Sequence, residues 1–195
     1  MKISSDSVAG LIARLLKARG VKHVFALCGG HIMPIWMRLD AEGIRIIDVR
    51  DERSAVHMAQ AHAELTGDLG VALVTAGPGF TNAITGIANA NVSRAPVLIL
   101  SGTVTRAQEN RGALQDLDQP QLVRSITRYA RTVREPSRAL SELDLAISCA
   151  LGEGGEPGPA FIDFPTDTLR AEIPKPLQMD EYISPKSPLV TLPDP

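Results

Sequence analysis

The sequence predicts an α/β fold, a three-layer, doubly wound domain with about six parallel strands and helices on both faces of the sheet. Short apolar runs alternate with helix-like segments along most of the chain, as in βαβ units joined by right-handed crossovers. Residues 71–75 form a continuous apolar run, which is typical of a strand covered on both faces. The 195 residues are enough for one full core and a tail.

The first predicted helix, 4–19, carries apolar residues at the spacing of one helical face and ends at Gly20. Ser4, Ser5 or Asp6 can cap its start. These signals place an amphipathic helix before the first strand.

A buried strand, 24–27, leads into a glycine pair and a short helix, 32–39. The next strand, 44–49, is entered through a glycine, and it is followed by a helix, 51–65. The inward face of that helix consists mainly of alanines, which allow it to lie close to a sheet.

The strand 71–75 precedes a glycine turn and a helix, 80–92, and another buried strand follows at 96–100. The polar segment 103–118 comes next. Its length of about 16 residues favours a functional loop over a simple connector.

The last predicted elements are a strand at 126–133, a helix at 137–151 and a strand at 160–164. We therefore expect one domain over residues 1–172. Residues 173–195 are rich in proline and show no periodicity, which predicts an extended linker toward further domains.

The composition excludes several classes of function. The net charge is −2, which gives no reason to expect nucleic acid or an anionic membrane as partner. Aromatic residues make up 4%, too few for stacking platforms that bind single strands. No run approaches the roughly 20 apolar residues that span a bilayer. We predict a soluble, cytoplasmic protein with a small-molecule substrate.

The turn Gly77-Pro78-Gly79 after the strand 71–75 contains the first two glycines of the dinucleotide fingerprint, but Asn82 occupies the third position. The following strand also ends without the carboxylate that this fingerprint requires. A Rossmann dinucleotide site is thus not expected. A tight turn that opens a helix is the alternative on this motif alone.

Asp51 and Glu52 begin a helix directly after a strand. Carboxylates stabilise helix N-termini, and Asp51 suits that capping role. Glu52, one residue further, can instead project over the edge of the sheet toward the glycine turn. The residues leave both an electrostatic and a catalytic role open for Glu52.

The four histidines lack the spacing of a metal site, and no metal ligands are predicted. His31 follows Gly29 and Gly30 at the end of a strand, where a ligand would pass. A structural or helix-capping role for His31 is the alternative.

Five stretches of the sequence match one known family in order and spacing, over about residues 3–172. They are Gly29-Gly30-His31-Ile32-Met33-Pro34, Arg50-Asp51-Glu52 with His57-Met58-Ala59, Thr75-Ala76-Gly77-Pro78-Gly79-Phe80-Thr81-Asn82, Asn110-Arg111-Gly112-Ala113-Leu114-Gln115-Asp116-Leu117-Asp118, and Gly158-Pro159-Ala160-Phe161-Ile162-Asp163-Phe164-Pro165. The chain resembles the N-terminal, pyrimidine-binding domain of thiamine diphosphate enzymes. It is most similar to acetolactate synthase large subunits and acetolactate-synthase-like 2-hydroxyacyl-CoA lyases.

The resemblance implies catalytic roles for two residues. Glu52 matches the glutamate that hydrogen-bonds N1′ of the cofactor's aminopyrimidine, which is acid–base work relayed through the cofactor. Gln115 matches a glutamine near the reaction centre, where it can steady substrate oxygens.

The resemblance also implies binding positions. The residues that match the cofactor-binding turn are Thr75, Gly77, Pro78, Gly79 and Asn82. The residues that match the substrate side are Gly29, Gly30, His31 and Leu114. Acetolactate synthases commonly have phenylalanine where Leu114 stands, so the substrate preference stays open between 2-oxo acids and 2-hydroxyacyl-CoA thioesters.

The family binds the diphosphate group through Mg²⁺ with a Gly-Asp-Gly to Asn motif in a C-terminal domain, and this sequence has no such motif. It also has no middle domain, which carries FAD in some relatives. The resemblance therefore implies that the chain alone is inactive. It implies a diphosphate-binding domain of the same or a partner chain, within a homo-oligomer such as a dimer or tetramer.

Three alternatives remain at this point. The chain can be a non-catalytic regulatory or assembly module, the α-type subunit of a split decarboxylase, or an α/β binding protein that does not use thiamine. The presence of both Glu52 and Gln115 favours the carboligase or lyase, because an assembly module does not need them.

Overall fold

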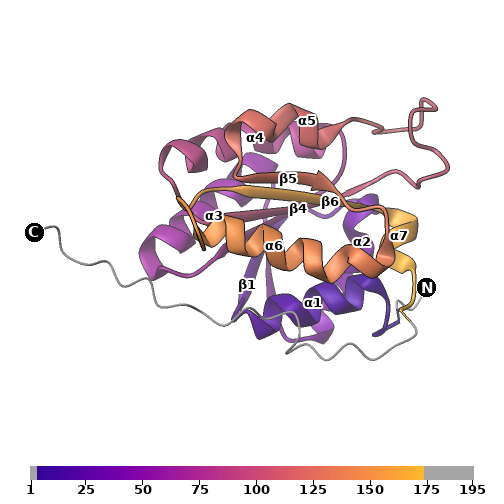
Figure 1. The fold of residues 1–195 in the computed structure, drawn as a ribbon, viewed down its shortest axis with the longest axis horizontal. Helices are drawn as coiled ribbons and strands as arrows, with labels where there is room; N and C mark the ends of the chain where they lie inside the picture. The colour runs from indigo at the N-terminus through magenta and orange to yellow at the C-terminus, as the bar shows by residue number, and fades with distance from the viewer. Residues whose placement is uncertain (1–3, 174–195) are drawn as a thin grey trace, which may run out of the picture.

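In the computed structural model, which describes residues 4–173, six strands form one sheet in which all neighbouring strands are parallel (Figure 1). Their order across the sheet is β2-β1-β3-β4-β6-β5. The strands are β1 (His23–Ala26), β2 (Arg45–Asp48), β3 (Gly70–Val74), β4 (Val97–Thr103), β5 (Tyr129–Thr132) and β6 (Ala160–Pro165). The predicted doubly wound fold is confirmed.

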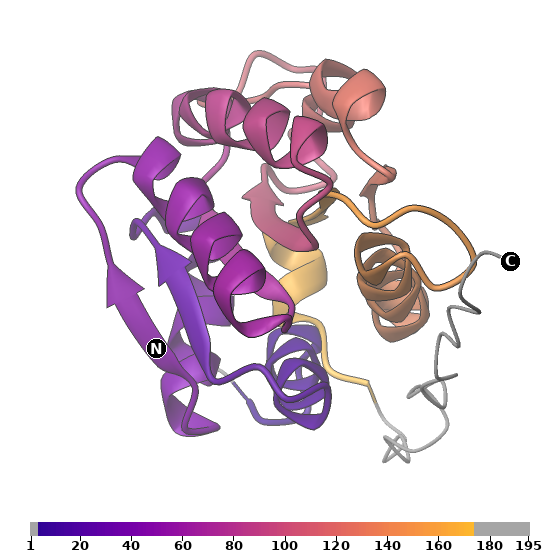
Figure 2. The same ribbon diagram turned by 90° about the vertical axis from the view of Figure 1, so that its left-hand side faces the viewer.

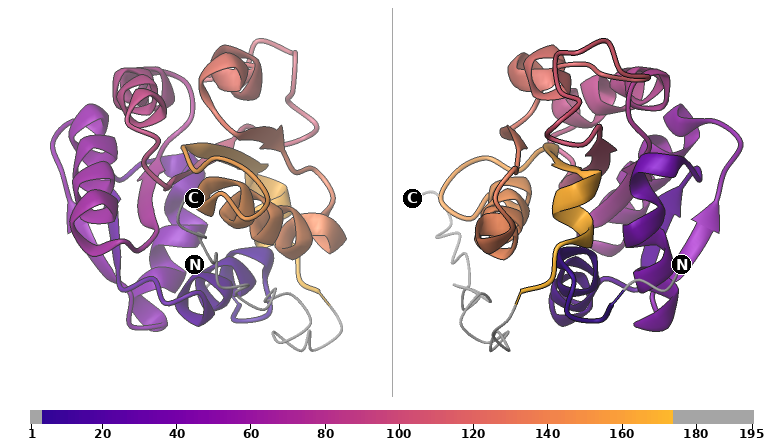
Figure 3. Two further views of the ribbon diagram at one scale, coloured as in Figure 1. Left: turned by 60° about the vertical axis from the view of Figure 1, so that its left-hand side comes forward. Right: turned by 90° about the vertical axis from the view of Figure 1, so that its right-hand side faces the viewer.

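Helices cover both faces of this sheet, and in Figure 1 α4 and α5 lie above the strands while α1 and α6 lie below. The helices are α1 (Val8–Ala18), α2 (Met33–Ala41), α3 (Glu52–Thr66), α4 (Pro78–Val92), α5 (Gln119–Val123), α6 (Ala139–Leu151) and α7 (Thr166–Arg170). Helices α3 and α4 pack side by side (Figure 2). Helix α7 lies next to α1 in both views of Figure 3.

The core consists of two hydrophobic clusters, one on each face of the sheet. The central strand β3 is apolar throughout because it is covered on both faces of the sheet. Its side chains point alternately to opposite faces, so Val71 and Leu73 join the cluster under α1 and α6. Ala72 and Val74 join the cluster under α3 and α4. Both sets are fully buried.

The first helix begins at Val8, four residues later than the predicted start at Ser4. Ser7, not one of the three predicted residues, is its N-cap, and the Ser7 hydroxyl accepts a hydrogen bond from Gly10 N at 3.2 Å. Ser7 N also donates to Ser4 O at 3.3 Å, which closes a turn before the helix begins.

Other boundaries also differ from the sequence prediction. Strand β4 continues to Thr103 because Ser101–Thr103 pair with Asp163–Pro165 of β6. Strand β5 starts only at Tyr129, since Arg124–Ile126 form a turn of 3-10 helix. The short helices α5 and α7 were not expected from the sequence pattern.

The end of the described chain returns to its beginning. Val8 N donates to Ala171 O at 2.9 Å, and Ile173 N donates to Asp6 O at 3.0 Å. Apart from Ile173, the predicted linker 173–195 lies outside the described residues. The division into residues 1–172 and 173–195 stays a prediction.

The strand order reverses between β1 and β3, because the chain runs outward from β1 to β2 and then crosses back to β3. The loops after β1 and β3 therefore diverge at their carboxyl ends. In open α/β sheets ligands bind in the crevice at such a point.

Candidate functional site

The predicted site residues come from the segments that follow four strands, β1, β2, β3 and β4. The carboxyl ends of parallel strands share one edge of the sheet. The crevice at the β1–β3 reversal is therefore where they can meet. The long loop after β4 projects beyond this edge in Figure 1.

Glu52 points inward from the first turn of α3 because its neighbour Asp51 takes the capping role. The Asp51 carboxylate accepts from Arg53 N at 2.9 Å and pairs with the Arg53 guanidinium at 2.6 Å. This hydrogen bonding lowers the pKa of Asp51 to about 2. Glu52 is only 6% exposed, and its Oε2 accepts from Asn82 Nδ2 at 3.1 Å. The structure thus places Glu52 against α4, beyond the glycine turn, and its catalytic role stays a prediction.

The glycine turn after β3 packs closely against the Glu52 carboxylate. A Cβ on Gly79 would lie 2.7 Å from Thr75 Cγ2 and 2.9 Å from Glu52 Oε1. A Cβ on Gly29, in the loop after β1, would lie 2.3 Å from Thr75 Cβ. Only glycine fits at these two positions without displacing the groups around Thr75, which directly follows strand β3.

Gln115 reaches this turn from the loop after β4. Its φ of +67° is left-handed, as is the φ of +65° at Gly77. A Cβ on Gly77 would lie 2.7 Å from Gln115 Cβ, so the backbone of the turn and the side chain of Gln115 are in direct contact. The predicted cofactor side and the predicted reaction-centre residue are therefore neighbours.

His31 is the substrate-side residue that the structure brings to Gln115. Burial lowers the pKa of His31, and its hydrogen bond with Gln115 partly opposes that effect. A neutral imidazole is favoured as a result. Among the described residues, His31 Nδ1 and Thr75 Oγ1 are buried and have no hydrogen-bond partner.

Three predicted residues lie toward the outside of this group. Leu114 is 84% exposed. Pro78 is the exposed first residue of α4. Gly30 has open space where a Cβ would stand. None of the three makes a close contact with Glu52 that the structure records, so their assigned roles remain predictions.

Sequence reasoning missed two buried polar residues behind the site, Gln119 and Asp163. Gln119 is fully buried at the start of α5, and its Nε2 donates to Asp163 Oδ2 at 2.6 Å. Burial raises the pKa of Asp163 to about 7, and the hydrogen bond from Gln119 opposes the rise. The available signal was a single acidic residue within the apolar strand 160–164.

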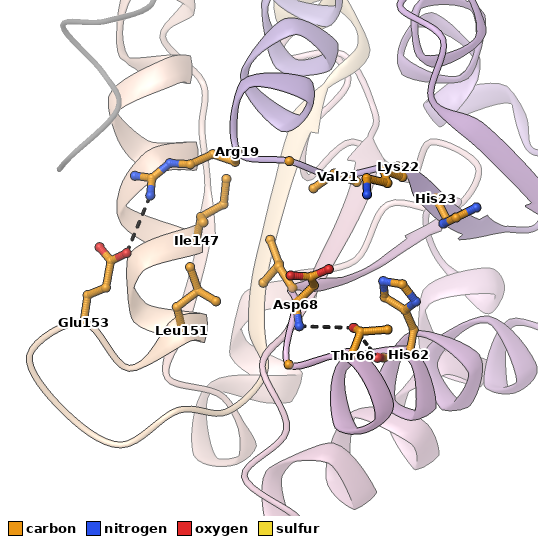
Figure 4. A pocket seen from close by; sticks show the side chains of 13 residues that line it. Arg19, Val21, Lys22, His23, His62, Thr66, Asp68, Ile147, Leu151 and Glu153 are labelled. Atoms are coloured by element: carbon orange, nitrogen blue, oxygen red, sulfur yellow. Dashed lines mark hydrogen bonds and ion pairs between the residues drawn. The ribbon is translucent and has the colours of Figure 1, made fainter. Parts of the chain in front are cut away.

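A pocket of about 490 Å³ lies at the opposite edge of the sheet, where α1, α3 and α6 end (Figure 4). The rings of His23 and His62 meet edge to face there, with centroids 5.9 Å apart. Arg19 and Glu153 form an ion pair at 3.6 Å on its other side. This pocket faces the amino ends of β1 and β3, so it is separate from the candidate site.

Residues 4–173 contain neither a metal cluster nor a membrane-spanning helix. No group of three or more His, Cys, Asp or Glu side chains in this part of the chain could hold a metal ion. Among the helices described, none has the length and apolar character needed to cross a membrane.

The model of the family described as "Thiamine pyrophosphate enzyme, N-terminal TPP binding domain" matches residues 6–122, more than half of the chain. The chain belongs to this family. The matched segment contains Glu52, the glycine turn and Gln115, which are the residues that the site geometry brings to one edge. The expected resemblance is confirmed.

Named relatives fall into two groups. The chain is 44% identical to a 2-hydroxyacyl-CoA lyase 2 of Danio rerio and 42% identical to that of Homo sapiens, each over 158 residues. It is 38% identical over 157 residues to an acetolactate synthase large subunit of Mycobacterium tuberculosis. These alignments cover 81%, 81% and 80% of this chain. They cover 25%, 25% and 28% of the relatives, so the chain spans about a quarter of their length.

Proposed function

We propose that this thiamine diphosphate-binding domain serves an enzyme that makes or breaks a C–C bond next to a carbonyl. The names of the relatives support 2-hydroxyacyl-CoA thioesters as one substrate class, and acetolactate synthases support 2-oxo acids as the other. The observation that carries the proposal is the Glu52 carboxylate, which is 6% exposed at the carboxyl edge of the sheet beside the glycine turn.

The residues at this edge fit an aminopyrimidine ring. Gly79 lets the turn lie close to the Glu52 carboxylate, because a Cβ there would come within 2.9 Å of Oε1. Thr75 Oγ1 and His31 Nδ1 are buried polar atoms for which residues 4–173 supply no partner. Buried polar groups are nearly always hydrogen-bonded, so a polar ligand in this crevice accounts for them.

When bound, thiamine diphosphate supplies a nucleophilic carbon that adds to carbonyl groups. Glu52 would hold a proton at Oε1 for N1′ of the aminopyrimidine, since Oε2 is already engaged by Asn82. The Asn82 amide fixes the orientation of the carboxylate and leaves the second oxygen for the ligand. This is positioned acid–base work by a single carboxyl group.

Gln115 and His31 would act on the substrate. The Gln115 amide can donate a hydrogen bond to a substrate oxygen, which stabilises negative charge that develops there. Burial favours neutral His31, whose Nδ1 has no partner among the described residues and whose hydrogen bond with Gln115 orients both groups. Leu114, which is 84% exposed, would contact the part of the substrate farther from the reacting carbon.

The diphosphate half of the site belongs, in this proposal, to a domain outside these 195 residues, in the same chain or a partner chain. That domain would hold Mg²⁺, and a full-length enzyme of the acetolactate synthase type would add FAD. We further propose a cytoplasmic homo-oligomer. The 195-residue chain alone should then show no lyase or synthase turnover.

The test is Glu52→Gln in an enzyme that joins this domain to its diphosphate-binding domain. Loss of the carboxyl proton should slow exchange of the cofactor's C2 proton by about 10²–10⁴-fold, the usual contribution of a positioned acid or base. Glu64→Gln is the matched control, because Glu64 is exposed on the same helix. Exchange in Glu52→Gln as fast as in the control would remove Glu52 from the mechanism.

A further inference from the structure

Gln119 connects three parts of the chain through one buried amide. Its Oε1 accepts from Gly77 N at 3.1 Å. Its Nε2 donates to Asp163 Oδ2 at 2.6 Å and to Gly102 O at 3.2 Å. The side chain thus ties the glycine turn after β3 to the ends of β4 and β6, and it is fully buried while it does so.

The position of Gln119 in the chain couples it to Gln115. It lies four residues after Gln115, at the first residue of α5, whose N-cap Asp118 accepts from Gln121 N at 3.3 Å. The loop therefore leaves the site and is anchored to the sheet within about one helical turn. Gln115, at the start of this interval, has a left-handed φ of +67°. A residue other than glycine keeps this conformation only where the surroundings impose it.

The same amide also fixes the other partner of Gln115. Gln119 accepts a hydrogen bond from the N–H of Gly77. Gly77 also lies against Gln115, since a Cβ added to Gly77 would be 2.7 Å from Gln115 Cβ. One side chain thus holds both the turn and the loop that touches it. An amide suits this position because it offers an acceptor to Gly77 N and donors to the oxygens of Gly102 and Asp163.

We propose that Gln119 is a positioning residue, which fixes the Gly77 turn against Gln115 and so sets the distance between the cofactor side and the substrate side of the site. The role of Gln119 in holding the turn against the loop concerns the structure of this chain alone. The consequence of that role for catalysis rests on the proposed function.

The contact can be measured in the 195-residue chain by NMR. In Gln119→Met, which keeps the length but removes donor and acceptor, the nuclear Overhauser effect between Gly77 Hα and Gln115 Hβ should disappear. Exchange of the Gly77 amide should become at least about tenfold faster, as expected when a buried hydrogen bond is lost. Gln121→Met, on the exposed side of the same helix, should change neither. An unchanged contact in folded Gln119→Met would overturn the proposal.

Gln119→Glu provides a second test if the methionine variant does not fold. At low pH the protonated glutamate can accept from Gly77 N and donate to Asp163, so the contact with Gln115 should persist. At high pH two carboxylates would face each other, and the contact should be lost reversibly. A contact that persists at both pH values in this variant contradicts the proposal.

The effect of Gln119 on catalysis has to be measured in an enzyme that also contains the diphosphate-binding domain. There Gln119→Met should lower kcat by about 100-fold, the effect of a misplacement of about 1 Å, while thiamine diphosphate still binds. A kcat equal to that of Gln121→Met would refute the catalytic part. If the parent enzyme itself neither forms nor cleaves the C–C bond, the proposed function fails, and the NMR contact still decides the role of Gln119.

Discussion

Replacing Asp163 by asparagine should remove most of the loss of stability that occurs between about pH 5 and about pH 8. Burial raises the pKa of Asp163 from 3.8 to about 7. The folded protein therefore binds more protons than the unfolded chain between these values. By proton linkage the free energy of unfolding falls as the pH rises through this window and levels off above it.

The magnitude follows from the two pKa values. One pKa unit corresponds to about 1.4 kcal/mol, so the full window contributes about 4 kcal/mol. Of this, about 2–3 kcal/mol falls between about pH 5 and about pH 8. The positive charge of Arg134 and the negative charge of Asp118 act on Asp163 in opposite directions and are included in its shift. Asparagine keeps an oxygen that can accept from Gln119 Nε2 and cannot ionise.

Urea unfolding of the parent chain and of Asp163→Asn at both pH values measures the difference. His31 titrates in the same range, but its pKa is lowered, so it contributes a change of the opposite sign in both proteins alike. The comparison between the two proteins therefore isolates Asp163. Equal pH slopes in the parent and the variant would refute the reasoning.

Two further predictions concern stability. Gly77→Ala should destabilise the chain by about 1–3 kcal/mol, because its φ is +65° and the new methyl group would lie 2.7 Å from Gln115 Cβ. Gly112 also has a positive φ, but a methyl group there would meet open space. Gly112→Ala should therefore lower the free energy of unfolding by less, and the difference between the two variants in thermal or urea unfolding measures the steric clash at Gly77. Phe80→Ala should cost about 3–5 kcal/mol, since Phe80 is fully buried. Leu65→Ala, at a position 86% exposed, should change stability by less than about 0.5 kcal/mol. Similar losses of stability in Phe80→Ala and Leu65→Ala would contradict the assigned core.

The strands β3, β4 and β6 are predictable from the sequence because they are covered on both faces. Strand β3 needs apolar residues at every position, and no periodic pattern is required to recognise it. The two five-residue helices α5 and α7 are different, since a segment of that length shows too little of a helical period. The extension of β4 through Ser101–Thr103 is set by pairing with β6, which is a tertiary effect.

The candidate site is predictable to a similar extent. The sequence places Glu52 and the glycine turn at the ends of strands, and parallel strands bring such ends to one edge. The inward orientation of Glu52 follows from the capping role of Asp51. Gln119 carries no such signal, because the partners of its amide lie 17, 42 and 44 residues away in the sequence. Only the folded chain brings those partners together.

The left-handed backbone of Gln115 has a consequence for how this position varies. Glycine would adopt the same φ without a steric penalty, so selection for stability alone would place glycine there. The presence of glutamine at residue 115 therefore runs against the local preference of the backbone. Sequence design guided by backbone fit would replace Gln115 by glycine, and it would discard the side chain that the candidate site needs.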